Sequence, residues 1–393
     1  MKKLFYLLFL SLWMFISCQR QAQIQESNNY KLFVTLENAP FDSLYLCDYT
    51  GDRKIYIAGE KTNEFTWEIT IPDSIVLNSE NLMSLAVSKY AFIGNSLSAT
   101  IRFIAERDEK KIAFANIGVE DRENYIYAVY MGKTVFPEEL IGMTIEGKDT
   151  IFFGNYICED FKLILQNDSS DITIRAQDPL FSWFSNMNNE ELSYNEYLER
   201  YDELSKKYPD SRFLMSSLSH QFYRYQSKSD LQRIYDNLSD KYKNTEWAKN
   251  IESYLQTKFE NTSLPTLNKD TYEDIVQDSS KYNLIIFTAS WCRPCIEEIP
   301  VLKEIYNDLN KNLVMTYISV DEEKTVKSFQ KQMREKNIPW RALLAYEDIE
   351  KIKTKYFVSG IPQGVLVYPD GTMSLIEVRD KEQREKLYSL CGK

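Results

Sequence analysis

Residues 284–300 read LIIFTASWCRPCIEEIP. An apolar run at residues 284–288 has the pattern of a buried strand, and the residues from Cys295 onward have the pattern of an amphipathic helix. Two thiols separated by two residues at the start of a helix can close into a disulfide. The position of Cys292 and Cys295 at this junction therefore predicts a redox site.

The two thiols of this motif are expected to differ in reactivity. Cys292 would lie over the helix N-terminus, where unpaired N–H groups and the helix dipole favour an anion, so we expect its pKa to be lowered. Arg293 adds a positive charge beside it, and Pro294 restricts the loop in the first helical turn. Cys295 lies one turn inward and should be shielded. We predict that Cys292 attacks a substrate disulfide and that Cys295 resolves the mixed disulfide.

Two other interpretations of the C-x-x-C motif remain open at this point. A tetrahedral zinc site needs two more ligands, but the sequence has one histidine, His220, and no second C-x-x-C motif, so we expect no metal. A purely structural disulfide is the other interpretation. Trp291 before the pair, Arg293 and Pro294 within it, and the strand-to-helix junction favour the redox role over both.

Residues 291–300 resemble the thioredoxin superfamily, and most closely its TlpA/ResA-type membrane-anchored thiol-disulfide reductases. The remaining C-terminal sequence predicts the order β-α-β-α-β-β-α, which is that of the thioredoxin core. The predicted strands are residues 284–288, 313–320, 364–368 and a run ending near 378, and the predicted helices are residues 295–309, 323–336, 348–356 and one ending at 391. We therefore expect an α/β thioredoxin fold here.

The resemblance implies roles for two prolines. Pro362 matches the family's cis-proline, which lies against the active-site dithiol and leaves the backbone of the preceding residue, here Ile361, free to pair with an extended substrate peptide. Pro300 matches the proline that kinks the active-site helix, and an interior proline kinks or ends a helix on physical grounds as well. Trp291, Arg293 and Pro294 are expected to tune the thiols or position the substrate.

Glu298 is the residue in which this sequence departs from cytosolic thioredoxins. Those proteins carry a buried aspartate at the position that Ile286 occupies here, so this chain has no acid at that position. Glu298 lies three residues beyond Cys295 on the same helix face, agrees with the ResA-type branch, and could assist deprotonation of Cys295. The alternative is that an acid in the first helical turn is simply favourable with the helix dipole.

The N-terminal residues predict export and a lipid anchor. A basic start at residues 1–3, an apolar run at 4–16 and Ser17-Cys18 read as a signal peptide that ends in a lipoprotein cleavage site, with Cys18 lipidated. The apolar run is shorter than the roughly 20 residues of a spanning helix. Residues 18–29 would form a flexible tether. Plain secretion and an uncleaved anchor remain alternatives, and the sequence does not decide between the outer and the inner membrane.

Length and composition are consistent with several domains and no nucleic-acid partner. The chain has 393 residues, 44% of them hydrophobic, and a net charge of −11 with no basic stripe. Cys47 and Cys158 could pair, although isolated cysteines are more often small buried hydrophobes. The predicted organisation is a signal peptide at 1–17, the tether at 18–29, a β-rich domain at 30–178, a helical domain at 179–260 and the thioredoxin-like domain at 262–393.

Residues 30–260 carry no chemical motif. Short alternating runs, the last at residues 171–176, predict a β-sandwich-like domain whose first half faintly resembles a β-domain of unknown function found upstream of thioredoxin modules. The helical pattern that follows is interrupted at residues 208–211, and His220 is expected to be packed inside a helix. Residues 261–265 are expected to be a linker.

Site and compartment together predict a lipid-anchored thiol-disulfide oxidoreductase of the cell envelope, facing the periplasm. It would reduce disulfides of exported proteins without a cofactor and receive electrons from another dithiol protein. A disulfide oxidase or isomerase is the alternative enzyme, because direction depends on the reduction potential. A third hypothesis is an envelope binding lipoprotein whose dithiol reports redox state.

Overall fold

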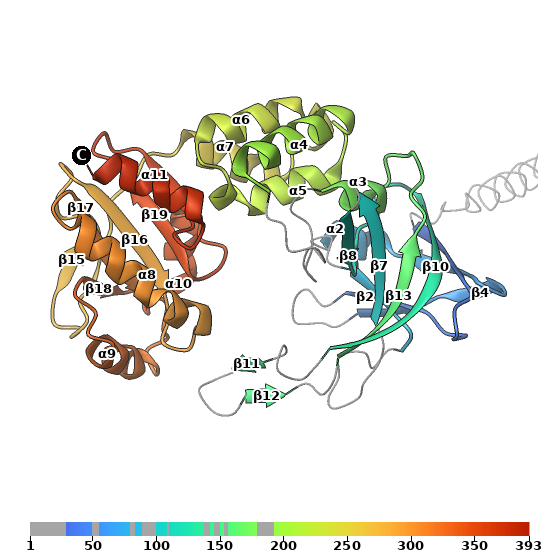
Figure 1. Cartoon of the computed structure of the whole chain (residues 1–393), viewed down its shortest axis with the longest axis horizontal. Helices are drawn as coiled ribbons and strands as arrows, with labels where there is room; N and C mark the ends of the chain where they lie inside the picture. Colours follow the sequence, from blue (N-terminus) through green and yellow to red (C-terminus); the bar gives the residue numbers. More distant parts are fainter. Residues whose placement is uncertain are drawn as a thin grey trace, which may run out of the picture.

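The computed structural model of the chain describes residues 29–48, 55–78, 83–88, 100–107, 110–136, 142–144, 150–152, 156–178 and 192–392. The predicted signal peptide, the lipidation residue Cys18 and nearly all of the tether lie outside these residues. Figure 1 shows a β-rich part, a group of helices and an α/β part that holds the C-terminus, with the helices between the other two parts. Within the described ranges, no helix is long and apolar enough to cross a membrane.

The β-rich part is built on one sheet of eleven strands. These are β1 (Tyr30–Glu37), β2 (Tyr45–Asp48), β3 (Ile55–Ala58), β4 (Glu60–Asn63), β5 (Thr66–Ile71), β6 (Met83–Ala86), β7 (Thr100–Arg107), β8 (Lys110–Phe114), β9 (Asn116–Ile117), β10 (Glu123–Phe136) and β13 (Tyr156–Leu163). Their order is β3-β2-β6-β7-β13-β10-β1-β5-β4, with β8 on β7 and β9 on β6. A separate pair is formed by β11 (Gly142–Thr144) and β12 (Thr150–Phe152).

The two ends of this sheet meet at Gly59. The end strands β3 and β4 are consecutive in the sequence and are separated only by this glycine, whose N–H donates to the carbonyl of Leu44 at 2.8 Å. A Cβ at Gly59 would lie 3.2 Å from side-chain atoms of both Trp67 and Ile69. The sheet therefore curls around a single core, in which Trp67 and Phe103 are fully buried.

The β-rich prediction for this part is confirmed, with two differences. The described strands form one curled sheet and one small pair rather than two stacked sheets. The predicted strand at residues 171–176 is wrong, because these residues belong to helix α3 (Asp171–Gln177). Ser170 caps this helix and Asp171 pairs with Arg175 one turn later, at 3.1 Å. Because the helix is buried almost all round, its apolar residues mimic strand alternation. A second short helix, α2 (Asp73–Asn78), lies within the same part.

The middle part is helical, as predicted. It contains α4 (Tyr194–Lys207), α5 (Arg212–His220), α6 (Lys228–Asn237) and α7 (Glu246–Gln256), with 3₁₀ turns η2 (Phe222–Arg224) and η3 (Asp240–Tyr242). Tyr208 ends α4 and the Ser211 side chain caps α5, so the predicted break is confirmed. The predicted packing of His220 is wrong. It is the exposed last residue of α5, and its Nδ1 lies 2.7 Å from the carbonyl oxygen of Ser216.

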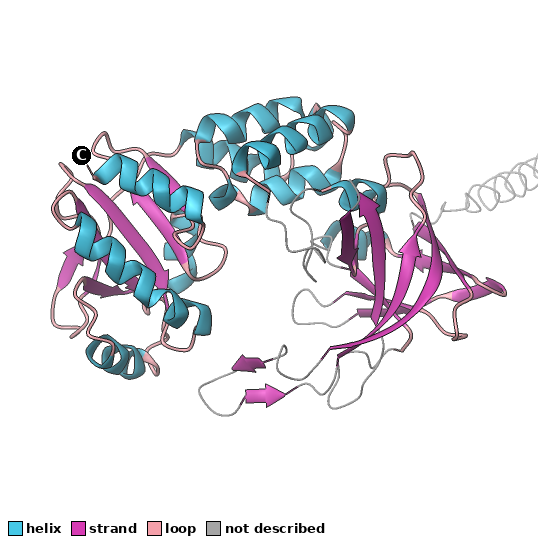
Figure 2. Cartoon of the chain, in the orientation of Figure 1, coloured by secondary structure: helices cyan, strands magenta, loops and turns pink. Residues whose placement is uncertain are grey.

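The α/β part has the predicted thioredoxin-like architecture. Its elements are β16 (Tyr282–Thr288), α8 (Arg293–Leu309), β17 (Leu313–Ser319), α9 (Val326–Glu335), β18 (Arg341–Leu344), α10 (Ile349–Lys355), β19 (Gln363–Val367), β20 (Met373–Ile376) and α11 (Lys381–Cys391). The sheet order is β18-β17-β16-β19-β20, with β16 parallel to β17 and antiparallel to β19. Figure 2 shows strands in this part and in the β-rich part, whereas the part between them is helical.

Sequence patterns missed three short strands of this part. The four-residue strand β18 follows Trp340 and is too short to show a period. The strand β14 (Ser263–Pro265) lies where a linker was expected at residues 261–265, and it forms a hairpin with β15 (Tyr272–Asp274). Thr266 next to β14 forms a bridge with Leu343, so the hairpin covers part of the edge strand β18.

Candidate active site

The two cysteines of the motif are joined in a disulfide at the N-terminus of α8. Their Cα atoms are 5.3 Å apart. Cys292 is the N-cap residue, and its Sγ accepts a hydrogen bond from the backbone N–H of Cys295 at 3.2 Å. Cys292 is 5% exposed and Cys295 1% exposed. The helix N-terminus therefore points a donor at the more accessible sulfur, which favours a thiolate on Cys292 when the pair is reduced.

The loop before β19 lies against this disulfide. The Ile361–Pro362 peptide bond is cis, as the family resemblance implies. The Sγ of Cys292 lies 3.8 Å from the carbonyl oxygen of Ile361. Ile361 and Pro362 are both half-buried, so part of the backbone beside the sulfur remains accessible. The structure thus brings together Cys292, Cys295 and Ile361, which are separated by almost 70 residues in the chain.

The residues around the dithiol contribute an apolar surface but little net charge. Trp291 is 46% exposed directly before Cys292. Arg293 donates through Nε to Glu297 at 2.8 Å, and both side chains are mostly exposed. The positive charge expected beside Cys292 is therefore partly neutralised by Glu297 and screened by solvent. Pro294 is exposed in the first turn of α8.

Glu298 is a buried acid on the inner face of α8. Its side chain is 3% exposed, whereas the neighbouring Glu297 is 60% exposed. Burial and, to a smaller extent, the charge of Glu377 raise the pKa of Glu298 to about 7, although the charge of Arg379 opposes this shift. The Arg379 Nε lies 3.9 Å from Glu298 but 3.1 Å from Glu377, so it pairs mainly with Glu377. A carboxyl group with this pKa can accept and release a proton near neutral pH, a property that the helix dipole alone does not require.

Ile286 and Pro300 lie in the strand and the helix that the sequence predicts for them. Ile286 is 1% exposed in the middle of β16, in the same apolar cluster as Leu302 of α8. Pro300 lies inside α8. The strand position that holds an acid in cytosolic thioredoxins is therefore part of the core in this chain.

Sequence patterns missed Asp321, which fixes the segment before the dithiol. Asp321 is 1% exposed and accepts hydrogen bonds from the Ser290 N–H at 2.8 Å and the Ser290 hydroxyl at 2.5 Å. The Ser319 hydroxyl also donates to it, at 2.8 Å. Asp321 follows the end of β17, next to the end of β16. A polar residue just after a buried parallel strand is the signal that could have identified it.

A cavity of about 210 Å³ lies between the helical part and the loop that leads to Ile361. Its lining includes His220, Asn250, Phe357 and Ser359. Phe357 has a positive φ of 57° and packs edge-on against Tyr254. The helical part thus forms one wall of a hollow beside the loop that carries the cis-proline.

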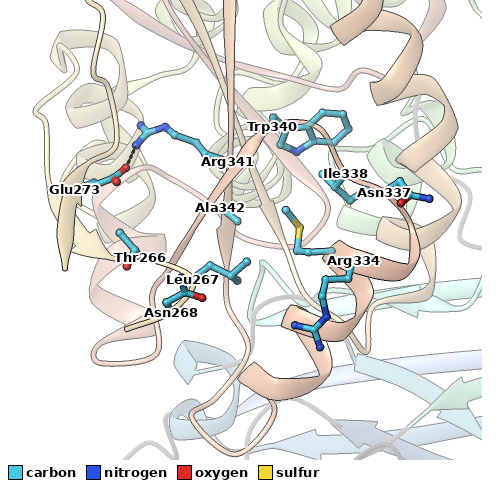
Figure 3. A pocket seen from close by; sticks show the side chains of 11 residues that line it. Thr266, Leu267, Asn268, Glu273, Arg334, Asn337, Ile338, Trp340, Arg341 and Ala342 are labelled. Atoms are coloured by element: carbon cyan, nitrogen blue, oxygen red, sulfur yellow. Dashed lines mark hydrogen bonds and ion pairs between the residues drawn. The ribbon is translucent and has the colours of Figure 1, made fainter. Parts of the chain in front are cut away.

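A larger hollow of about 680 Å³ lies beside β18, which is an edge strand of the α/β sheet. Figure 3 shows its lining, in which Arg341 extends toward Glu273 and pairs with it at 3.0 Å. Neither cysteine lines this hollow. Access of a substrate to Cys292 therefore does not pass through it.

Comparison with known proteins is consistent with this geometry. A family model described as thioredoxin-like matches residues 279–373. The chain is 28% identical over 101 residues to the M-type chloroplastic thioredoxin of Chlamydomonas reinhardtii, which covers 26% of this chain and 67% of that protein. The residues matched by the family model include both cysteines and the cis-proline.

Two solved structures are also similar to a part of this chain. One is the thioredoxin domain of a thiol-disulfide oxidoreductase from Bacteroides vulgatus, at 21% identity and a TM-score of 0.32, covering 34% of this chain and 96% of that one. The other is a thiol-disulfide oxidoreductase from Bacteroides fragilis, at 23% identity and a TM-score of 0.31, covering 34% of this chain and 99% of that one.

Proposed function

We propose, starting from the thioredoxin-like domain at the C-terminus, that this chain is a lipid-anchored thiol-disulfide oxidoreductase of the cell envelope that reduces disulfides in exported proteins. The observation that carries this proposal is the position of the Cys292 sulfur. It lies 3.2 Å from the Cys295 N–H and 3.8 Å from the Ile361 carbonyl oxygen. The Cys292 sulfur therefore has a hydrogen-bond donor that stabilises its thiolate, and it lies beside the Ile361 backbone, with which a substrate peptide could pair.

The proposed reaction starts from the reduced pair. The Cys292 thiolate attacks one sulfur of a substrate disulfide, the substrate S–S bond breaks, and the departing sulfur takes up a proton. Glu298 accepts the proton of Cys295, whose thiolate attacks the Cys292 sulfur of the mixed disulfide. The substrate leaves with both sulfurs reduced, and Cys292 and Cys295 are oxidised to the disulfide. A dithiol protein returns two electrons and restores the reduced pair.

The loop at Ile361 supports a protein substrate. The half-buried Ile361 lies beside the reactive sulfur, and the exposed Trp291 directly precedes Cys292 in the chain. An extended peptide could pair with the Ile361 backbone and place its disulfide against Cys292. The apolar surface of Trp291 would then contact the residues that flank the substrate disulfide.

The compartment follows from the N-terminal sequence. Ser17-Cys18 after an apolar run supports lipidation at Cys18, which would hold the chain on a membrane of the cell envelope, facing the periplasm. Disulfides form and persist in such an oxidising compartment, so exported proteins there offer substrates for a reductase. The chain needs no cofactor for this reaction.

Reduction of insulin disulfides by the Cys292→Ser variant tests the proposed chemistry. We expect this variant to be inactive and Cys295→Ser to accumulate a mixed disulfide with insulin, because the resolving thiol is missing. Cys391→Ala is the matched control, since Cys391 is buried at the end of α11 and burial raises its pKa to about 11. Insulin reduction by Cys292→Ser at the parent rate would contradict the proposal.

The reduction potential of the Cys292–Cys295 pair tests the direction of the reaction. Equilibration with glutathione or dithiothreitol buffers should give a value near the thioredoxin end, about −270 mV, for a reductase. A value near about −120 mV would instead indicate that the protein introduces disulfides. Normal cellular function of the Cys292→Ser variant would favour the binding-lipoprotein hypothesis over both enzymes.

A further inference from the structure

The outer face of the β-rich part carries an unusual concentration of exposed apolar side chains. Eight large apolar side chains of the described residues are at least 40% exposed, and six of them lie on β10 or directly after β13. These six are Tyr125, Tyr127, Met131, Val135, Ile164 and Leu165. Scattered exposed apolar residues are normal on a soluble protein, but a concentration on two neighbouring strands indicates a contact surface.

Four residues of this face lie side by side and define a surface that we call the apolar patch: Phe33, Tyr125, Tyr127 and Ile164. Phe33 pairs in register with Tyr125, and the two rings stack with centroids 5.1 Å apart. The Ile164 N–H donates to the Tyr127 carbonyl at 2.9 Å, which places Ile164 beside Tyr127.

The two tyrosines of the patch lie on the outer face of β10, and the inner face of this strand is packed in the core. Ile126 and Ala128 alternate with Tyr125 and Tyr127 along β10, and both are 2% exposed in the core of the curled sheet. Successive side chains of a strand point to opposite faces. The exposed tyrosines therefore cannot turn inward, and only another surface can cover them.

The charged residues around the patch have no positive excess. Lys31 pairs with Glu68 at 2.6 Å, and Lys162 pairs with Glu106 at 3.6 Å. Glu123 accepts a hydrogen bond from the Tyr125 hydroxyl at 2.7 Å. The rim therefore offers no excess of positive charge for phosphate groups, and a partner would be held mainly by apolar contact.

The start of β1 connects the patch to the N-terminal segment. β1 begins at Tyr30 and runs parallel to β10, with Lys31 opposite Glu123. The chain therefore enters the sheet at the end of β10 where Tyr125 lies. Residues 18–29 span at most about 40 Å when fully extended. If Cys18 carries a lipid, the patch stays within this distance of the bilayer.

We propose that the apolar patch rests in the interfacial region of the bilayer to which the chain is anchored. The ligand is a lipid surface, and neutral headgroups suffice because the rim has no positive charge in excess. Tyrosine suits this environment, because its ring is apolar and its hydroxyl can stay among the headgroups. This inference rests on the proposed lipid anchor. Because the helices lie between the β-rich part and the α/β part (Figure 1), the contact would hold the dithiol away from the lipid.

Quenching of tryptophan fluorescence by lipids brominated on their acyl chains tests this contact. The full chain, lipidated in the cell and reconstituted in phosphatidylcholine vesicles, would carry Tyr127→Trp in one sample and Tyr272→Trp in another. Tyr272 is 59% exposed on the α/β part, so it is a matched surface control. The native tryptophans give the same background in both. We expect brominated lipids to quench the fluorescence added by Tyr127→Trp and to leave that added by Tyr272→Trp unchanged.

The outcomes separate the contact from the anchor. A full chain that does not float with the vesicles would overturn the proposed anchor and this inference with it, whereas flotation lost only in Cys18→Ala supports the anchor. Flotation with equal quenching of both variants would overturn the contact alone. Light scattering in detergent that shows a dimer, lost in the double variant Tyr125→Ser and Tyr127→Ser, would assign the patch to a second copy of the chain and contradict the lipid surface.

Discussion

The carboxylate of Glu120 accepts a hydrogen bond from the backbone N–H of Phe213 at 2.7 Å. Glu120 follows β9 in the β-rich part, and Phe213 lies in the first turn of α5. The Ser211 hydroxyl that caps α5 also points at Glu120, at 3.4 Å, and Arg212 donates to the Val76 carbonyl at 2.7 Å. A helix start of the middle part is thus held by an acid from the β-rich part.

Replacing Glu120 should loosen this junction. We expect Glu120→Ala to lower the free energy of unfolding by about 1–2 kcal/mol, because a helix start loses an acceptor. Burial raises the pKa of Glu120 to about 7, so the comparison is made at pH 5, where the cost of an ionised buried carboxylate does not enter. Glu120→Gln keeps an oxygen for Phe213 and should lose less. Urea unfolding followed by circular dichroism measures both variants. Glu60→Ala, at an exposed position of β4, is the control. A Glu120→Ala variant as stable as this control would show that the contact contributes nothing.

Glu298 should make stability depend on pH. Its folded pKa of about 7 is above the ordinary 4.5, so the folded protein binds this proton more tightly than the unfolded chain does. Stability therefore falls as pH rises from about 4.5 to 7, and above this the ionised carboxylate costs about 3 kcal/mol, to order of magnitude. We expect Glu298→Gln to be more stable than the parent in urea at pH 8, with a smaller difference at pH 5.

The same substitution should slow the reaction, because Cys295 loses its proton acceptor. Higher stability together with slower insulin reduction would distinguish a functional acid from a structural one. Glu297→Gln is the control, since Glu297 is exposed and pairs with Arg293. If the stability difference caused by Glu298→Gln is the same at pH 5 and pH 8, Glu298 does not titrate in this range.

Asp321→Asn should weaken the segment that carries the dithiol. Its carboxylate accepts two hydrogen bonds from Ser290 and one from Ser319, and Asn offers one acceptor oxygen without charge. We expect unfolding to require about 1–3 kcal/mol less free energy and insulin reduction to slow. Glu322→Gln, at an exposed neighbouring position, should change neither quantity. Parent-like stability and rate in Asp321→Asn would show that this network is dispensable.

Gly59→Ala should strain the place where the ends of the curled sheet meet. The added methyl group would lie 3.2 Å from atoms of Trp67 and Ile69 and 3.3 Å from the Leu44 carbonyl oxygen, closer than carbon atoms usually pack. We expect a loss of about 1–3 kcal/mol, as for other overpacked cores. Gly360→Ala is the control for stability, since a Cβ there has no neighbour within 4 Å. Equal thermal midpoints for the two variants would mean that the meeting point can relax.

The sequence predicted the α/β part well because its signals are local or belong to a known pattern. The apolar run before Cys292 and the helix after it have clear periods, and Pro362 was placed by the family motif. Asp321 was missed because its partner Ser290 is 31 residues away. β18 was missed because four residues show no period. Short elements and distant polar pairs are determined by tertiary contacts, which periodicity does not report.

The β-rich part was predicted in kind but not in topology. Alternation along β1 and β5 identifies strands, yet it does not show that β1 pairs in parallel with β10 or that the sheet ends meet at Gly59. Residues 171–176 were assigned to a strand because burial on both sides of α3 removes the polar face by which a helix is usually recognised.

Contacts between the helices and the α/β part oppose a division of the chain between these two parts. The hydroxyl of Tyr254 accepts a hydrogen bond from the Leu375 N–H at 3.1 Å. The rings of Tyr254, Phe222 and Phe357 contact one another. One apolar cluster runs from the helices to Cys292. A fragment cut at residue 262 would expose Phe357 and leave the Leu375 N–H to water. The sequence pattern changes near residue 261, but the hydrophobic core continues from the helical part into the α/β part.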